Sequence, residues 1–121
     1  MEDRSKQFGL WIPAEIYRNP VMTHLDMFLF GLLHYLCKVE GGTCTATNAE
    51  LAHDLNVKPD TIQRSLKRLL EEGYITKNDI KNASGVVIKR ALKIDDNFKA
   101  LYAMYLNDEP KEPLPEYKRR T

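Results

Sequence analysis

The four residues Asn56 to Pro59, with the sequence NVKP, constrain the fold of this 121-residue chain more than any other short stretch. Asn takes the left-handed backbone conformation more readily than most residues, and Pro is favoured in the first turn of a helix, where its missing N–H is not needed. The stretch therefore predicts a tight turn between two helices. Gly73 marks the end of the second helix, since Gly is the usual residue just past a helix C-terminus.

The helix before this turn is predicted from Thr47 over about nine residues, TNAELAHDL. Thr47 and Glu50 have the S/T-x-x-E spacing of a capping box, in which each side chain bonds to the backbone N–H of the other residue. An apolar face follows, and Val57 in the turn can bury between the two helices. The buried face of the first helix consists of Leu51, Ala52 and Leu55.

The helix after the turn is predicted over Pro59–Glu72 and has two distinct faces. At 100° per residue, Ile62, Leu66 and Leu69 share the inward face. The opposite face is polar and basic, which suits either solubility or a polyanionic partner. That outward face carries Asp60, Arg64, Lys67 and Arg68, with Thr61 and Gln63 at its flanks.

A long helix is predicted upstream, from Thr23 to about Val39, with Thr23 as its N-cap and Asp26 as an acidic residue in its first turn. It is apolar over more than one face, so it is either covered on two sides or contributes to a subunit contact. Covering by Trp11, Ile16 and a C-terminal helix is the favoured alternative. The expected core stripe is Leu25, Phe28, Leu29, Leu32, Leu36 and Val39, with Met27, Phe30 and Tyr35 outside it.

Strand signals surround the central pair of helices. Thr43–Thr45, which follows two glycines, suits a short strand, and residues 74–77 and 86–94 suit a hairpin around a polar loop at 78–85. Asp95 or Asp96 can cap a last helix. The expected apolar face of that helix is Phe98, Leu101, Tyr102 and Tyr105.

These elements predict a mainly helical α+β fold: three core helices, a short strand, a hairpin and an extra C-terminal helix. We expect an N-terminal arm at 1–7, a domain at 8–95, a helix at 96–107 that packs on the domain or on a second subunit, and a flexible tail at 108–121. The tail has three prolines and eight charged residues in fourteen, too little apolar surface to offset the entropy of ordering.

Charge is distributed unevenly along the chain, although the total is only +1. Residues 58–93 contain nine basic and four acidic residues, a net charge of +5, so the rest of the chain carries −4. Attraction to phosphate depends on the local potential, and this segment is therefore the candidate for nucleic-acid contact.

Several other classes of protein are disfavoured. No run approaches the roughly 18 apolar residues of a membrane helix, and residues 1–7 lack the features of a signal peptide, which predicts a cytoplasmic protein. The sequence has no Gly-rich phosphate loop and no catalytic set at recognisable spacing, so we expect no enzyme, no cofactor and no small-molecule ligand. A zinc site from His34, Cys37, Cys44 and His53 is a weaker alternative to buried thiols, because no short Cys-x-x-Cys spacing exists.

The run CTATNAELAHDLNVKPDTIQRSLKRLLEEGYI resembles the winged helix-turn-helix domains of bacterial, plasmid and phage proteins. It is most similar to those at the N-termini of replication initiators and phage replisome organisers, and to those of small regulators. The similarity spans about Phe8 to Ile94 and is most specific from ELAHDL onward. Lys58 stands where these domains usually have a Ser or Thr cap before the Pro.

The resemblance implies that the helix at 59–72 enters the major groove of double-stranded DNA and that the hairpin is a basic wing. Gln63 and Arg64 are the candidates for base edges, because Gln can pair twice with adenine and Arg twice with guanine. The other positions would face DNA as well, with Thr61 given no more specific role and the rest contacting phosphates or the minor groove. They are Thr47, Asn48, Lys58, Thr61, Lys67 and Arg68 around the helices and Lys81, Asn82, Ser84 and Lys89 in the wing.

A small transcriptional regulator of a prokaryote or its phage or plasmid is the function that we expect, with an accessory protein of DNA replication as the alternative. A winged helix used for protein contacts is a second alternative, because a fold does not fix a function. We also expect a homodimer, since one recognition helix reads too few base pairs for useful specificity.

Overall fold

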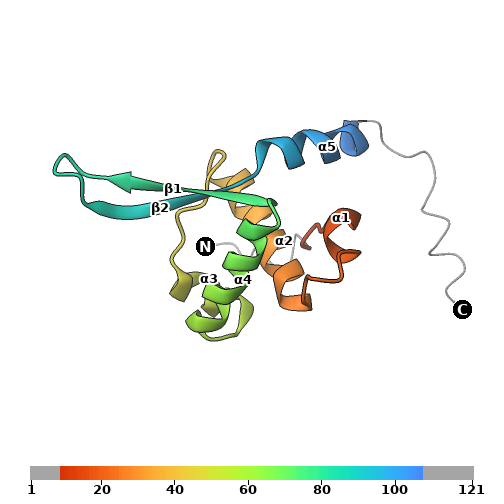
Figure 1. Ribbon diagram of the computed structural model, residues 1–121, viewed down its shortest axis with the longest axis horizontal. Helices are drawn as coiled ribbons and strands as arrows, with labels where there is room; N and C mark the ends of the chain where they lie inside the picture. The colour runs from red at the N-terminus through yellow and green to blue at the C-terminus, as the bar shows by residue number, and fades with distance from the viewer. Residues whose placement is uncertain (1–8, 108–121) are drawn as a thin grey trace, which may run out of the picture.

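The computed structural model describes the backbone of residues 9–107 and the side chains of residues 9–101. Its helices are α1 (Ala14–Tyr17), α2 (His24–Val39), α3 (Asn48–Leu55), α4 (Pro59–Glu71) and α5 (Asp96–Asn107), and its strands are β1 (Ile75–Lys81) and β2 (Val87–Ile94). Helices α1 to α4 form one body, from which the β1–β2 hairpin projects (Figure 1). This arrangement confirms the mainly helical winged helix-turn-helix fold.

Helix α2 begins at the N-cap expected at Thr23, and the structure adds a full capping box: the Thr23 hydroxyl accepts a hydrogen bond from the Asp26 N–H, and the Asp26 carboxylate accepts one from the Thr23 N–H. The expected core stripe was partly wrong, because Phe28 and Val39 are 50% and 55% exposed. Contacts come from α1, α3, α4 and β2, so the buried arc is set by several neighbours rather than by one regular stripe. The residues buried on α2 are Asp26, Leu29, Phe30, Gly31, Leu32, Leu33, Leu36 and Cys37.

The turn between α3 and α4 has the predicted chemistry. Thr47 and Glu50 form the capping box, and Asn56 takes the left-handed conformation with φ of 58°. The Val57 N–H donates to the Ala52 carbonyl at 3.0 Å, which closes the end of α3. Pro59 opens α4, and Lys58 is its N-cap residue without a side-chain cap bond, consistent with the missing Ser or Thr. The local signals therefore set both helix boundaries.

The strands differ from expectation in length. The short strand expected at Thr43–Thr45 is a single antiparallel bridge, Cys44 to Leu92, with backbone hydrogen bonds of 2.7 and 2.8 Å. Strand β1 instead continues to Lys81, through part of the segment expected as a loop. Antiparallel pairing with β2 satisfies the backbone N–H and C=O groups of its residues whether their side chains are polar or apolar. The hairpin is therefore longer, with the turn limited to residues 82–86.

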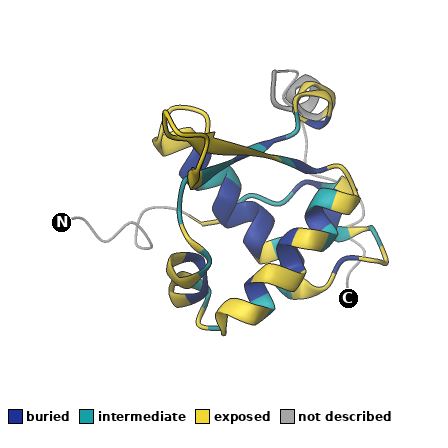
Figure 2. Cartoon of the chain, turned by 60° about the vertical axis from the view of Figure 1, so that its left-hand side comes forward, coloured by how far each residue is buried: buried dark blue, intermediate teal, exposed yellow. Residues whose placement is uncertain are grey.

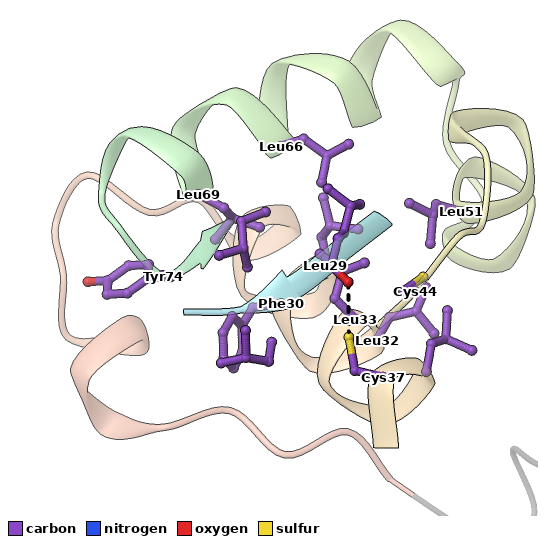
Figure 3. Close-up of a cluster of buried hydrophobic side chains, with 14 of the residues drawn as sticks. Leu29, Phe30, Leu32, Leu33, Cys37, Cys44, Leu51, Leu66, Leu69 and Tyr74 are labelled. Carbon is purple, nitrogen blue, oxygen red and sulfur yellow. Dashed lines mark hydrogen bonds between the residues drawn. The ribbon is translucent and has the colours of Figure 1, made fainter. Parts of the chain in front are cut away.

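The core lies where α2 meets α4, α3 and the base of the hairpin (Figure 3). The Cys37 thiol donates a hydrogen bond of 3.4 Å to the Leu92 carbonyl, and burial raises the pKa of Cys37 to about 11. Cys44 is fully buried as well. Within the described residues, no three His, Cys, Asp or Glu side chains are grouped so that they could hold a metal ion. Both cysteines act here as small apolar core residues.

Helix α5 is capped by Asp95, whose carboxylate accepts a hydrogen bond of 3.1 Å from the Phe98 N–H. Phe98 packs edge-on against Phe30, with ring centroids 5.7 Å apart, and this contact ties the start of α5 to α2. Leu101, expected on the same apolar face, is 47% exposed. The side chains of Tyr102 and Tyr105 lie outside the described residues, as do the arm at 1–7 and the tail at 108–121. Over residues 9–107, no helix is long and apolar enough to cross a membrane.

Gly31→Ala should destabilise the fold, because a Cβ at this position would lie 2.8 Å from the Leu10 Cβ. We expect a loss of about 1–3 kcal/mol in the free energy of unfolding, the usual range for overpacking. Urea unfolding followed by circular dichroism measures the loss, and Trp11 fluorescence reports any displacement of the adjacent segment. Gly9→Ala is the control, since nothing lies within 4 Å of an added Cβ there. Leu10→Gly should partly rescue Gly31→Ala; a variant as stable as the wild type would contradict the close contact.

Candidate nucleic-acid interface

Helix α4 docks on the body through one face and presents the opposite face to solvent. Ile62 and Leu69 are fully buried and Leu66 is 4% exposed. Gln63, Arg64 and Lys67 are exposed, and their side chains make no hydrogen bond or ion pair with any described residue. These three side chains are therefore available to an external partner.

The structure corrects the expectation for Arg68, which was grouped with the outward cations. Its guanidinium forms a two-pronged ion pair with Asp26 of α2, at 2.7 Å from Nε to Oδ2 and 2.9 Å from Nη2 to Oδ1. Ser65 donates a third hydrogen bond, of 2.5 Å, to Asp26 Oδ1. Two-thirds of the Arg68 side chain is buried. Arg68 holds α4 in place and is not a free phosphate ligand.

The Asp26 carboxylate is completely buried, which by itself raises its pKa. Hydrogen bonds from Arg68, Ser65 and the Thr23 N–H outweigh this effect, so the pKa of Asp26 lies below its ordinary value. The carboxylate therefore stays ionised in the folded protein at neutral pH. Sequence reasoning missed the contact with α4 because Asp26 already had a local explanation as an acidic residue in the first turn of α2. The available signal was a Ser at position 65, on the buried face of α4.

At the N-terminus of α3, the side chains of Thr47 and Asn48 differ in which hydrogen-bonding groups they can offer a partner. The Thr47 hydroxyl accepts a hydrogen bond of 3.1 Å from the Glu50 N–H, so it can offer a partner its O–H but has spent one acceptor site. Asn48 is half-buried, and its side-chain oxygen has no hydrogen-bond partner among the described residues. Lys58, in the turn, is exposed, and Thr61 is half-buried in the first turn of α4.

The wing presents exposed side chains at Lys81, Ser84 and Lys89. Asn82 differs, because its side-chain oxygen accepts hydrogen bonds from the backbone N–H groups of Ser84 (2.9 Å) and Val86 (3.0 Å). Asn82 thus builds the turn, and its NH₂ group remains as a donor. The hairpin tip is exposed throughout (Figure 2).

Arg90 is a structural residue of the wing that the sequence did not single out. Its Nη2 donates a hydrogen bond of 3.1 Å to the carbonyl of Ala46, the residue before Thr47. Burial lowers the pKa of this guanidinium, which nevertheless remains charged at any ordinary pH. The bond joins the wing to the start of α3, so the α3 N-terminus, the outward face of α4 and the wing belong to one connected framework.

Comparison with known proteins agrees with this geometry. Residues 23–75, from the N-cap of α2 to the start of β1, match the family model of a helix-turn-helix domain. No curated protein matches the sequence. Over this segment the chain is similar to helix-turn-helix domains.

Solved structures are similar to this chain at low sequence identity. The transcriptional regulator SlyA is 18% identical with a TM-score of 0.50, over 78% of this chain and 59% of the SlyA chain. Two mutants of Lactococcus lactis ZitR are 17% and 14% identical, with TM-scores of 0.47 and 0.45. They cover 84% and 94% of this chain and 60% and 78% of theirs. The chain thus spans about 60% of the SlyA chain and of one of the ZitR chains.

Asp26→Asn should lower the free energy of unfolding at neutral pH and should make that free energy depend less steeply on pH in the acid range. Because folding lowers the pKa of Asp26, its ionised form contributes stability above the unfolded pKa of about 3.9, and this contribution is lost as the pH falls through the folded value. We expect a cost of roughly 3 kcal/mol at pH 7, the lower end for breaking a buried pair, because Arg68 keeps some contact with water. Urea unfolding at several pH values between 7 and 3 measures both effects.

The control for this variant is Asp54→Asn, which removes an exposed carboxylate from α3. It should leave both the stability and its pH dependence close to those of the wild type. An Asp26→Asn protein that loses stability with acid as steeply as the wild type would show that another group carries the acid dependence.

Proposed function

We propose that the protein is a sequence-specific, double-stranded DNA-binding transcriptional regulator. Its recognition helix α4 would lie in the major groove, with the wing on the adjacent minor groove or backbone. The observation that carries this proposal is the outward face of α4. Gln63, Arg64 and Lys67 are exposed and have no hydrogen-bond or ion-pair partner among the described residues, while the rest of the helix is fixed by apolar packing and by the Asp26–Arg68 ion pair.

The exposed side chains divide by chemistry. We assign Gln63 and Arg64 to base edges, since both can make paired hydrogen bonds to one base. We assign Lys67 and Lys58 to phosphates, which position a protein without reading sequence. Thr61 and the α3 N-terminal residues Thr47 and Asn48 would add neutral donors to the backbone of the duplex. In the wing, Lys81 and Lys89 would supply charge, and Ser84 and the Asn82 amide would supply hydrogen bonds.

The regulator role rests on the domain rather than on the relatives. SlyA is described as a transcriptional regulator, but at 18% identity the likeness concerns the fold. The helix-turn-helix match over residues 23–75 supports DNA as the partner, and we infer regulation as the use of that binding. Such a protein would act in the cytoplasm, on the chromosome.

We further propose that it binds DNA as a homodimer. One recognition helix reads too few base pairs to select a site in a genome, whereas two helices read two half-sites about one helical turn apart. Phe28 on α2 is 50% exposed, and Val21, just before α2, is 52% exposed. We assign these two apolar side chains to the contact with a second copy. Sedimentation at micromolar concentration tests the dimer, and a footprint without two-fold symmetry would contradict it.

The competing use of this fold is contact with another protein. Salt dependence separates the two, because binding through phosphates falls steeply as salt rises, whereas binding through apolar surface does not. Selection of bound duplexes from a random pool, followed by titration between low and high salt, tests the proposal directly. Failure to enrich any sequence, with no binding at low salt and micromolar protein, would overturn it.

Arg64→Ala should relax base preference. Loss of a paired contact to guanine is expected to cost about 1–3 kcal/mol on the selected sequence and much less on a sequence changed at that base. Competition binding with single-base variants of the selected duplex measures the difference. Arg68→Ala is the contrasting variant: it should lower the free energy of unfolding through the loss of the Asp26 pair, which Arg64→Ala should not do.

Lys67→Ala should weaken binding to all sequences alike. Removing one phosphate contact is expected to reduce the slope of log affinity against log salt by about 1, with base preference unchanged. Lys99→Ala, which removes an exposed lysine from α5, is the matched control and should leave the slope unaltered. A base-selective loss in Lys67→Ala would reassign this side chain to a base edge.

A further inference from the structure

The tip of the wing carries an apolar surface that the proposed phosphate contacts do not use. Val86 and Ile88 are each 58% exposed, Val87 is 50% exposed and Ile80 is 39% exposed. Ile80 lies on β1, Val87 and Ile88 lie on β2, and Val86 lies in the turn between the strands. The hairpin itself projects beyond the helical body (Figure 1). Scattered exposed aliphatics are ordinary, but a cluster at the end of a projecting element marks a contact surface and is otherwise an aggregation hazard.

The register of the hairpin aims these side chains outward. Ile80 pairs with Lys89, and Lys81 pairs with Val87, so Ile88 has no partner on β1 and forms a bulge. A bulge increases the local twist and redirects the extra residue. Because Ile80 and Lys81 are consecutive, their side chains point to opposite faces, and each face of the tip has a lysine beside an aliphatic residue.

The charge around this surface favours a polyanion over a second copy of the wing. From Lys77 to Arg90 the hairpin has four basic residues and one acidic residue, a net charge of +3. Two such tips in apolar contact would bring like charges together in a partly desolvated interface, which is unfavourable. A duplex would neutralise the same lysines on its phosphates.

The position of the wing favours DNA among polyanions. The bond from Arg90 to the Ala46 carbonyl holds the hairpin base beside the α3 N-terminus, and α3 packs on α4. The tip therefore projects from the same framework that carries the outward face of α4. A duplex held by α4 would therefore lie beside the wing.

We propose that the wing tip is an apolar wedge for the minor groove of DNA. Ile88, aimed by the bulge, and Val87 enter the groove against sugars and base edges and partly unstack one base step, while Lys81 and Lys89 hold the flanking phosphates. The duplex then bends away from the wing. This inference rests on the proposed DNA binding and adds a mode of contact that the lysines alone would not supply.

The wedge has a consequence for sequence preference. Pyrimidine–purine steps such as TA unstack most easily, so the wedge should favour such a step under the wing without any hydrogen bond to its bases. This preference would be separable from the one set by Gln63 and Arg64.

The test compares the wild type with Val87→Thr/Ile88→Thr, a double substitution that keeps β-branching and all wing lysines. The probe is a selected duplex with 2-aminopurine at each step under the wing in turn and with a dye pair at its ends. We expect the wild type to raise the fluorescence of one step and to shorten the end-to-end distance. The variant should lose both signals and bind about tenfold more weakly, with an unchanged salt slope.

Val39→Thr is the matched control, since it alters an exposed valine on α2, outside the wing. The single variant Ile88→Thr is tested in parallel, so that the wedge can still be tested if the double variant misfolds. Circular dichroism confirms that each is folded. A double variant with wild-type affinity and both signals overturns the wedge and leaves the proposed function intact. Wild-type protein that binds no duplex overturns the proposed function itself. A variant that changes the sedimentation of the free protein assigns the tip to self-association and also overturns the wedge.

Discussion

A single buried carboxylate fixes the orientation on which the rest of the structure depends. Asp26 lies at the start of α2 and accepts hydrogen bonds from Thr23 of its own capping box and from Ser65 and Arg68 of α4. A buried charge is tolerated where its partners satisfy it, and losing a partner costs several kcal/mol, roughly 3–5. The rotation of α4 about its own axis is therefore determined by a polar contact as well as by the packing of its aliphatic residues.

This contact explains why two arginines one helical turn apart do different work. Arg64 and Arg68 occupy the same helix, yet Arg68 turns inward to Asp26, while Arg64 makes no hydrogen bond or ion pair with any described residue. Moving Arg68 to a phosphate would leave Asp26 without its main partner. The basic surface of α4 is therefore narrower than its composition indicates, and its centre lies at Gln63, Arg64 and Lys67.

Local chemistry made much of the fold predictable. The caps at Thr23 and Thr47, the left-handed Asn56, Pro59 and Gly73 act through backbone groups within a few residues, and each has the conformation expected. Contacts between distant residues were not predictable in this way. Asp26 and Arg68 are 42 residues apart, and Ala46 and Arg90 are 44 apart. Helical or strand periodicity does not predict contacts between residues so far apart in the sequence. The misassigned stripe of α2 has the same origin, because several other elements, distant in sequence, decide which of its faces is covered.

The base of the wing is anchored to the helical body and partly buried, whereas its tip is exposed to solvent. Its base is held by the Cys44–Leu92 bridge, by the Arg90–Ala46 bond and by the burial of Ile75 and Ile94. Its tip has cross-strand pairs but no cover. A two-stranded hairpin is marginal by itself in water, so the stability of the tip depends on the anchored base. Aliphatic side chains on such an arm lose little conformational entropy on binding, because β-branched residues are already restricted at χ1. An arm that is fixed at its base and apolar at its end therefore loses less conformational entropy on binding a partner than a flexible basic loop of the same charge.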